Sequence, residues 1–224
     1  MFSQTFRRRG GALLIGLALS ATALLPAASG VVNADHEQAE FPLVVANPNL
    51  LPCLAEHPGD PKKAPTASVE VERGDLNDTL KLHLRNIKPG LAFDLFTVQR
   101  TNKLANGTPD PAFTNFGLAW YQSDVQADDN GNANVTIKTI LLDQIFGFDP
   151  DANLAPTNTF HVGFWFNNPQ DAAPCGFNPA KPTPFNGEHK AGPFAMISLP
   201  VHDSKLGPLC TDPNFSTHPV SCDP

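Results

Sequence analysis

The sequence predicts an all-β protein, and three observations support that prediction. Twenty-three prolines and 16 glycines interrupt the 224-residue chain, which works against long helices. Apolar and polar side chains alternate over short stretches, which is the period of a strand with one wet face. Turn residues separate these stretches. About seven short strands divided by turns are typical of an antiparallel β-sandwich, immunoglobulin-like or related, with a small barrel as the alternative.

The clearest strand is 79–86, where leucines at 80, 82 and 84 alternate with Lys81, His83 and Arg85. Further strands are expected at 68–73, 91–99, 116–125, 133–140, 159–167 and 194–201. The Asp-Asp-Asn-Gly-Asn stretch at 128–132 predicts a hairpin turn, because Asn-Gly tolerates positive φ. Residues 141–148 fit either a short helix or an irregular edge. The long connections 101–114 and 168–193 are expected to be either functional or poorly ordered.

The N-terminal segment 1–30 predicts export. Arg7, Arg8 and Arg9 precede an apolar run at 12–25, and small residues follow at 27–30. This is the order of a secretory signal peptide, with cleavage expected between residues 28 and 34. The apolar run is shorter than the roughly 20 residues that span a bilayer, which argues against a retained anchor. The arginines also suggest a twin-arginine signal, although Gly10-Gly11 fits that route poorly.

Three segments follow the predicted signal peptide: a proline-rich extended arm at 35–65, the β-sandwich domain at 66–205 and a C-terminal tail at 206–224. Cleavage leaves 12 basic and 22 acidic residues, a net charge of −10. An acidic surface argues against nucleic-acid and anionic-membrane partners. No later apolar run is long enough to span a membrane. We therefore expect a secreted protein, extracellular or in the cell envelope.

Four cysteines follow the signal: Cys53, Cys175, Cys210 and Cys222. Four cysteines in an exported chain favour two disulfides, for which three pairings exist. We favour Cys53–Cys175, which ties the arm to a late loop, and Cys210–Cys222, which closes a short loop in the tail. A zinc site is the competing interpretation, but no pair has the close C-x-x-C spacing that zinc sites prefer.

The best candidate site lies between residues 161 and 192. On the predicted strand, Gly163 separates His161 from Trp165 on one face, which predicts a shallow recess with aromatic and polar walls. Such surfaces bind ring-shaped ligands. The candidate binding residues are His161, Trp165, Asn167, Asn186, Glu188 and His189. The expected partners are a glycan, a small molecule or an extracellular protein. The alternative is a strand buried on both faces, with a disulfide-pinned loop packed over Trp165.

Catalytic signatures are mostly absent: there is no nucleophile elbow, phosphate-binding loop or dinucleotide fingerprint. The leading hypothesis is therefore a non-catalytic binding protein, with no catalytic residue, metal or cofactor assigned. The alternative is a hydrolase that uses Glu188 and His189 as an acid–base pair, with Asp171 or a metal. A third hypothesis is a purely structural envelope protein.

Other metal motifs are weak. His36-Glu37 begins like a zinc-protease helix, but Glu40 stands where the second histidine belongs. The 128–132 turn resembles part of a calcium loop but lacks the glutamate that should follow. The seven histidines contain no H-x-H or H-x-x-x-H pair, so a metal site from His161, His189 and a third residue would have to assemble in three dimensions.

Two segments stand out as motifs: Phe-Trp-Phe-Asn-Asn-Pro at 164–169 and Thr-Pro-Phe-Asn-Gly-Glu-His-Lys-Ala-Gly at 183–192, with Cys175 between them. These segments resemble a group of uncharacterised secreted bacterial proteins. The resemblance extends to residues 116–122 and to the Asp-Asn-Gly turn, and covers about half of the chain after the signal. It implies export and a bacterial origin. That group has no assigned activity, so the resemblance assigns no catalytic residue.

Overall fold

The structure is a computed structural model that describes residues 38–74, 77–139, 159–183, 190–201, 206–210, 213–214 and 221–222. All of them belong to one structural unit, Asp35–Pro224. The predicted signal peptide and residues 141–148 lie outside the described residues. No helix among the described residues is long and apolar enough to cross a membrane.

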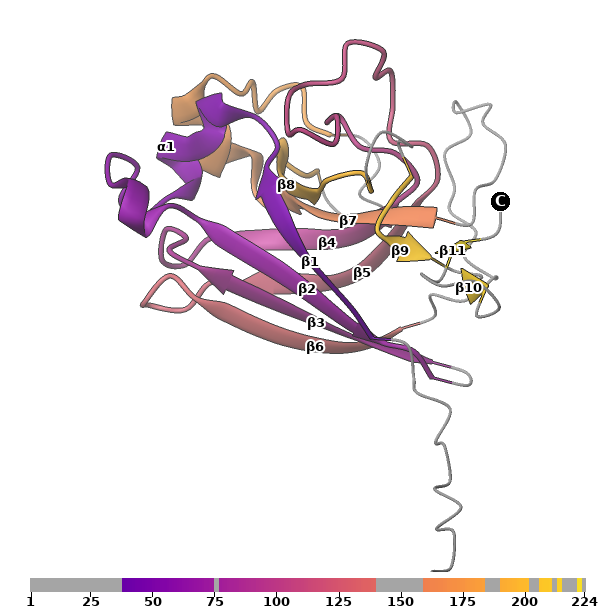
Figure 1. Cartoon of the computed structure of the whole chain (residues 1–224). Coiled ribbons are helices and arrows are strands. Elements are labelled where there is room, and N and C mark those ends of the chain that lie inside the picture. Colours follow the sequence, from indigo (N-terminus) through magenta and orange to yellow (C-terminus); the bar gives the residue numbers. More distant parts are fainter. Residues whose placement is uncertain are drawn as a thin grey trace, which may run out of the picture. The chain divides into compact units, whose positions relative to one another are not determined.

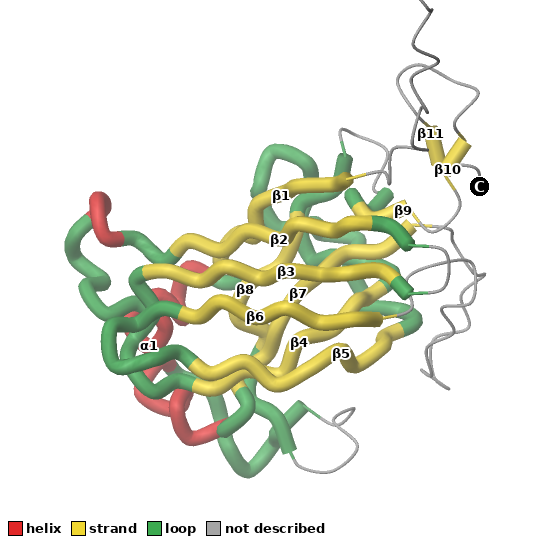
Figure 2. The backbone as a smooth tube through the Cα atoms, turned by 90° about the horizontal axis from the view of Figure 1, so that it is seen from below, coloured by secondary structure: helices red, strands yellow, loops and turns green. Residues whose placement is uncertain are grey.

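The all-β prediction is confirmed. One antiparallel sheet has the order β5-β4-β7-β8-β1-β2-β3-β6, with β9 paired to β7. Figure 2 shows β1, β2, β3 and β6 in one layer, with β4, β7 and β8 behind them. The architecture is thus intermediate between the expected sandwich and the alternative barrel. The strands are β1 (Gln38–Val45), β2 (Thr66–Glu72), β3 (Asp78–Arg85), β4 (Ala92–Val98), β5 (Ala119–Gln126), β6 (Ala133–Thr139), β7 (Thr159–Phe166), β8 (Phe194–Ser198), β9 (Leu209–Cys210), β10 (Pro213–Asn214) and β11 (Ser221–Cys222).

The arm contributes more than its proline-rich composition predicts. Its first part is β1, which pairs with β2 on one side and with β8 on the other. β1 therefore joins the two halves of the sheet (Figure 1). The rest of the arm forms η1 (Pro48–Leu50), α1 (Leu51–Leu54) and η2 (Pro61–Lys63). The only run in the arm that predicts a buried strand is the short apolar patch at 43–46.

The core lies between the two layers and is built from alternate residues of the strands, as strand periodicity requires. Leu80, Leu82 and Leu84 are fully buried, as predicted, while Lys81 and His83 on the opposite face are not. The ring of Phe93 contacts Phe164 and Phe166 at centroid distances of 4.8 and 5.5 Å. The main core also contains Phe41, Leu43, Val69, Val71, Leu95, Val125, Phe160, Val162 and Met196.

The predicted turn at 128–132 joins the terminal strands β5 and β6, but the expected hairpin does not form in the described sheet, because β5 pairs with β4 and β6 pairs with β3. Asp128 and Asn132 pair through their backbones, and Gly131 adopts φ 69°. Further along these strands a β-bulge makes Gln122 the extra residue of β5. Gln122 Nε2 donates to Thr97 Oγ1 of β4 at 3.1 Å, and Oε1 accepts from Thr139 Oγ1 of β6. The bulged glutamine thus links three strands across the place where the sheet comes back on itself.

The outer face of β2, β3 and β6 is polar, and its charged groups pair across strands. Lys81 Nζ lies 3.0 Å from both Glu70 Oε1 and Glu72 Oε1. His83 Nδ1 lies 2.8 Å from Asn134 Oδ1 on the next strand. Cross-strand pairs of this kind stabilise a sheet whose face remains solvated. We call this surface the polar face.

The disulfide Cys53–Cys175 is confirmed, and it connects α1 to η3 (Pro169–Cys175) at one end of the sheet. Cys210 is also disulfide-bonded. The side chain of its expected partner, Cys222, lies outside the described part of the chain, so that pairing stays a prediction. Near Cys210, buried Asp78 pairs with Arg73 at 3.0 Å, and Arg73 donates to the Cys210 carbonyl. The tail is thereby fixed against β2 and β3.

Candidate functional site

Trp165 does not form the wall of an open recess, because only 1% of it is exposed. It belongs to a second cluster on the outer face of β4, β7 and β8. The Trp165 ring lies 5.0 Å from Phe96, 5.2 Å from Phe116 and 4.2 Å from Phe194, measured between centroids. Phe113 and Tyr121 extend this set through Phe116 and Phe96. We call these six residues the outer aromatic cluster.

The space beside Gly163 exists as the sequence predicts, but the protein fills it with a ring of its own. A Cβ placed on Gly163 would lie 2.5 Å from the Phe194 ring and 2.9 Å from the Met196 carbonyl oxygen. The glycine therefore admits Phe194 rather than a ligand. The strand is thus buried on both faces, as the alternative expects, but the connection whose ring contacts Trp165 is not the disulfide-pinned loop. Here that connection is residues 99–118, which bring Phe113 and Phe116 onto the cluster.

His161 is also fully buried, so it cannot contact a ligand from solvent. Its Nδ1 lies 3.1 Å from Ser198 Oγ and 3.2 Å from the Ser198 carbonyl oxygen. The Val162 N–H donates to the same hydroxyl at 3.1 Å. A serine beside a histidine suggests a nucleophile and its base. Here both are closed off from substrate, so the pair links β7 to β8 structurally.

Asn167 is half-buried, and its Nδ2 donates to Oδ1 of buried Asp94 at 2.8 Å. Asn186, Glu188 and His189 lie outside the described residues, so the proposed acid–base pair remains a prediction. Asp171, which the hydrolase alternative invokes, lies in the first turn of η3. Burial raises the pKa of Asp171, and nearby Lys88 opposes that shift.

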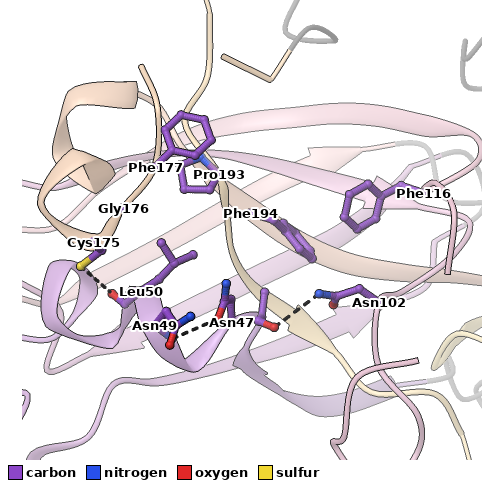
Figure 3. A pocket seen from close by; sticks show the side chains of 11 residues that line it. Asn47, Asn49, Leu50, Asn102, Phe116, Cys175, Gly176, Phe177, Pro193 and Phe194 are labelled. Atoms are coloured by element: carbon purple, nitrogen blue, oxygen red, sulfur yellow. Dashed lines mark hydrogen bonds between the residues drawn. The ribbon is translucent and has the colours of Figure 1, made fainter. Parts of the chain in front are cut away.

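The structure shows a different cavity next to the aromatic cluster. It is an open pocket of about 480 Å³. Three asparagines and three phenylalanines supply most of its side chains (Figure 3). Its lining residues are Ala46, Asn47, Asn49, Leu50, Asn102, Phe116, Cys175, Gly176, Phe177, Pro193 and Phe194. We call it the amide–aromatic pocket, and none of its lining residues is charged.

Local hydrogen bonds fix each wall of this pocket. Asn47 caps η1, accepting the Asn49 N–H on its Oδ1 at 3.0 Å, so its amide nitrogen stays available to donate. Asn102 Nδ2 donates to the Ala46 carbonyl at 3.4 Å, which ties residues 99–118 to the end of β1. Gly176 ends η3 with φ 89°, a conformation that favours glycine. The disulfide holds this turn beside η1 and α1.

Phe116 and Phe194 connect the pocket to the predicted site, because both contact Trp165 and both line the pocket. The binding residues predicted from the sequence that the structure describes lie near this pocket, but none of them is among its lining residues. The Asn47-Pro48-Asn49 turn carried a helix-cap signal that was available in the sequence. Nothing local indicated that this turn and Asn102 would meet, since they are far apart along the chain.

No three His, Cys, Asp or Glu side chains within the described ranges come together to hold a metal ion. In the turn at 128–132, Asp128 Oδ1 accepts the backbone N–H groups of Asn130 and Asn132, each at 2.9 Å. This carboxylate oxygen therefore holds the turn itself, as the simple turn interpretation expects. Comparison with known proteins adds no further identification: no protein-family model and no curated protein matches this chain.

Proposed function

We propose that this is an exported, non-catalytic binding protein whose amide–aromatic pocket holds a neutral, hydroxyl-bearing ring such as a glycan residue. The observation that carries the proposal is the composition of the pocket: three amide side chains and three aromatic rings, with no charge, around about 480 Å³. That volume is in the ~300–1,000 Å³ range of small-molecule sites.

The chemistry of the lining selects the ligand class. An amide both donates and accepts hydrogen bonds, so the Asn47 and Asn49 side chains suit hydroxyl groups, which do the same. Phe177 and Phe194 offer apolar faces against which the C–H face of a sugar ring packs. A charged ligand would lose hydration there without gaining an opposite charge, which is costly. The pocket therefore favours a neutral ligand.

Export is supported by the order of segment 1–30 and by the disulfide. Disulfides form and persist in oxidising compartments, and Cys53–Cys175 is formed in this structure. The sheet begins at Gln38, downstream of every expected cleavage point. Removal of the signal would therefore leave the described sheet intact.

The test is ligand-detected NMR on the oxidised protein with cellobiose, chitobiose and maltotriose, and with glucuronate as a charged counterpart. We expect binding of at least one neutral sugar and none of glucuronate. Asn49→Ala should weaken that binding by about tenfold, the equivalent of one hydrogen bond at ~1.4 kcal/mol. Asn49 is the suitable residue because its side chain is exposed and its backbone alone makes the local turn.

Asn130→Ala is the matched control, because Asn130 is an exposed asparagine in a turn outside the pocket. It should leave binding unchanged. Binding that Asn49→Ala and Phe177→Ala both leave intact would place the ligand elsewhere. Equal binding of glucuronate and the neutral sugars would contradict the selection argued from the uncharged lining.

A further inference from the structure

Two walls of the amide–aromatic pocket come from segments far apart in the sequence. Asn47, Asn49 and Leu50 belong to the turn that leads into α1, whereas Cys175, Gly176 and Phe177 end η3. The two cysteines of the Cys53–Cys175 disulfide are separated by 122 positions in the sequence, and the bond connects these segments directly behind the pocket. Cys175 itself lines the pocket and is half-buried, whereas Cys53 is 2% exposed.

No direct hydrogen bond joins residues 47–55 to residues 168–177, both of which the structure describes in full. Cys175 Sγ lies 4.0 Å from the Leu50 carbonyl oxygen (Figure 3), but a sulfur in a disulfide has no proton to donate. Lys88 approaches both sides: it donates to the Pro52 carbonyl at 3.3 Å, and its charge opposes the rise that burial causes in the pKa of Asp171. Apart from that lysine, only the disulfide and apolar contacts hold the walls together.

We propose that the Cys53–Cys175 disulfide is a redox control of the pocket, so that the protein binds its ligand when oxidised and releases it when a dithiol reduces this bond. That the pocket binds a ligand rests on the proposed function. That the disulfide sets the spacing of the pocket walls does not. Reduction removes the one covalent link between the two walls. The pocket then loses the fixed spacing between the amides of one wall and Phe177 of the other.

The reduction has a defined route. A thiolate of the dithiol attacks Cys175 Sγ, because Cys175 is the half of the bond that reaches the pocket. A mixed disulfide forms at Cys175, and Cys53 leaves as a thiolate. The second thiolate of the reductant then attacks the reductant's sulfur in that mixed disulfide, forming a cyclic disulfide and freeing Cys175. Two electrons pass from the dithiol to the protein, and both cysteine thiolates take protons from water.

The coupling must act in both directions. A ligand that binds the oxidised pocket better than the reduced one makes the disulfide harder to reduce by the same factor. A ligand in the pocket also covers the approach to Cys175. Occupied protein should therefore resist reduction longer than empty protein.

The first experiment needs no ligand. Hydrogen exchange is measured on the full chain, oxidised and after reduction with dithiothreitol, with cysteine alkylation to identify the bond that was opened. We expect reduction of Cys53–Cys175 to speed exchange about tenfold, or ~1.4 kcal/mol of opening free energy, at residues 48–55 and 170–177. Exchange in β2 and β3 serves as the internal reference. Unchanged exchange in both pocket walls would overturn the proposal.

Two variants separate this local effect from a general loss of stability. Cys53→Ser/Cys175→Ser should reproduce the faster exchange without reductant, whereas Cys210→Ala/Cys222→Ala should leave both pocket walls protected. Equal deprotection of the pocket walls in the two variants would contradict a specific role for Cys53–Cys175.

A final experiment repeats the reduction with cellobiose or chitobiose present. Slower reduction of Cys53–Cys175 supports the coupling to ligand. If the walls open on reduction but neither sugar slows it, the redox control stands and the sugar proposal fails.

Discussion

The two outer faces of this sheet carry different kinds of side chain, polar on one face and aromatic on the other. The polar face on β2, β3 and β6 carries charged and amide side chains that pair with one another across strands. The face of β4, β7 and β8 carries Phe96, Trp165 and Phe194, and residues 99–118 cover it. The side chains of the polar face satisfy one another and need no cover. The aromatic face needs a separate segment of chain to remove its rings from water.

The difference shows where a pocket can arise in this fold. A polar strand face whose side chains pair with one another stays open to water and needs no cover. A covered aromatic face has an edge where the covering segment ends, and the amide–aromatic pocket lies at such an edge, between Asn102 and Phe194. Packing the second face therefore creates a cavity at its rim.

The largest expected effect comes from emptying the covered face. Trp165→Ala removes a ring that three aromatic neighbours enclose, and should cost about 3–5 kcal/mol of unfolding free energy. Thr136→Ala on the polar face should cost about 0.5 kcal/mol or less. Urea denaturation of both variants measures the contrast, and similar values would mean that the two faces contribute alike.

A smaller effect is expected where the two layers meet. Gln122→Ala leaves the hydroxyls of Thr97 and Thr139 without the amide that joins them, and should cost about 1–3 kcal/mol. Gln126→Ala is the control, since Gln126 is an exposed glutamine on the same strand. Hydrogen exchange in β6 should rise in the first variant only. Equal exchange in the two would show that the bulge does not hold the layers together.

Two lysines, one in the covering segment and one on the polar face, should affect stability in opposite ways as pH changes. Lys103, in the covering segment, is 4% exposed, and burial lowers its pKa below the ordinary 10.5. The folded protein therefore releases this proton at a lower pH than the unfolded chain, and the unfavourable contribution of Lys103 to stability shrinks as pH rises toward about 10.5. Lys103→Met should raise the melting temperature at pH 7, and the gap from wild type should narrow toward pH 10.5. A gap that widened with pH would contradict the desolvation argument.

Lys81 on the polar face should stabilise the protein at neutral pH, and its substitution should change the melting temperature least of all. Its side-chain hydrogen bonds to Glu72 and then Glu70 raise its pKa above 10.5. Its contribution to stability is therefore complete below pH 10.5 and is lost as pH rises through the higher folded value. Lys81→Gln should lower the melting temperature slightly at pH 7 and have no effect above that range. Thermal unfolding from pH 7 to pH 11.5 gives the comparison.

The strands with one wet face were predictable because their alternation is local. Residues 79–86 show it directly, and β3 occupies nearly that range. β1 was harder, because prolines surround its apolar patch and its partners in β8, Met196 to Ser198, are remote from it in the sequence. When the position of a central strand is set by partners far away in the sequence, the strand's own residues do little to predict it.

The sequence predicted residues near the candidate pocket but not the residues that line it. Gly163 correctly indicated space beside Trp165, yet space on a strand can be filled from another strand, as Phe194 does here. Asn102 and Ala46 meet because the covering segment follows the aromatic face to the end of β1. That encounter depends on tertiary packing, which alternation and spacing do not encode.

The place of β1 has a consequence for the timing of folding. Among the strands of the described sheet, β1 leaves the ribosome first, yet one of its two neighbours, β8, is among the last. Until β8 is available, β1, β2, β3 and β6 can pair among themselves, and the two layers can meet only where β5 and β6 lie together. Non-local pairings of this kind fold slowly. The pairing of β1 with β8, which closes the sheet on that side, therefore cannot form until β8 has been synthesised.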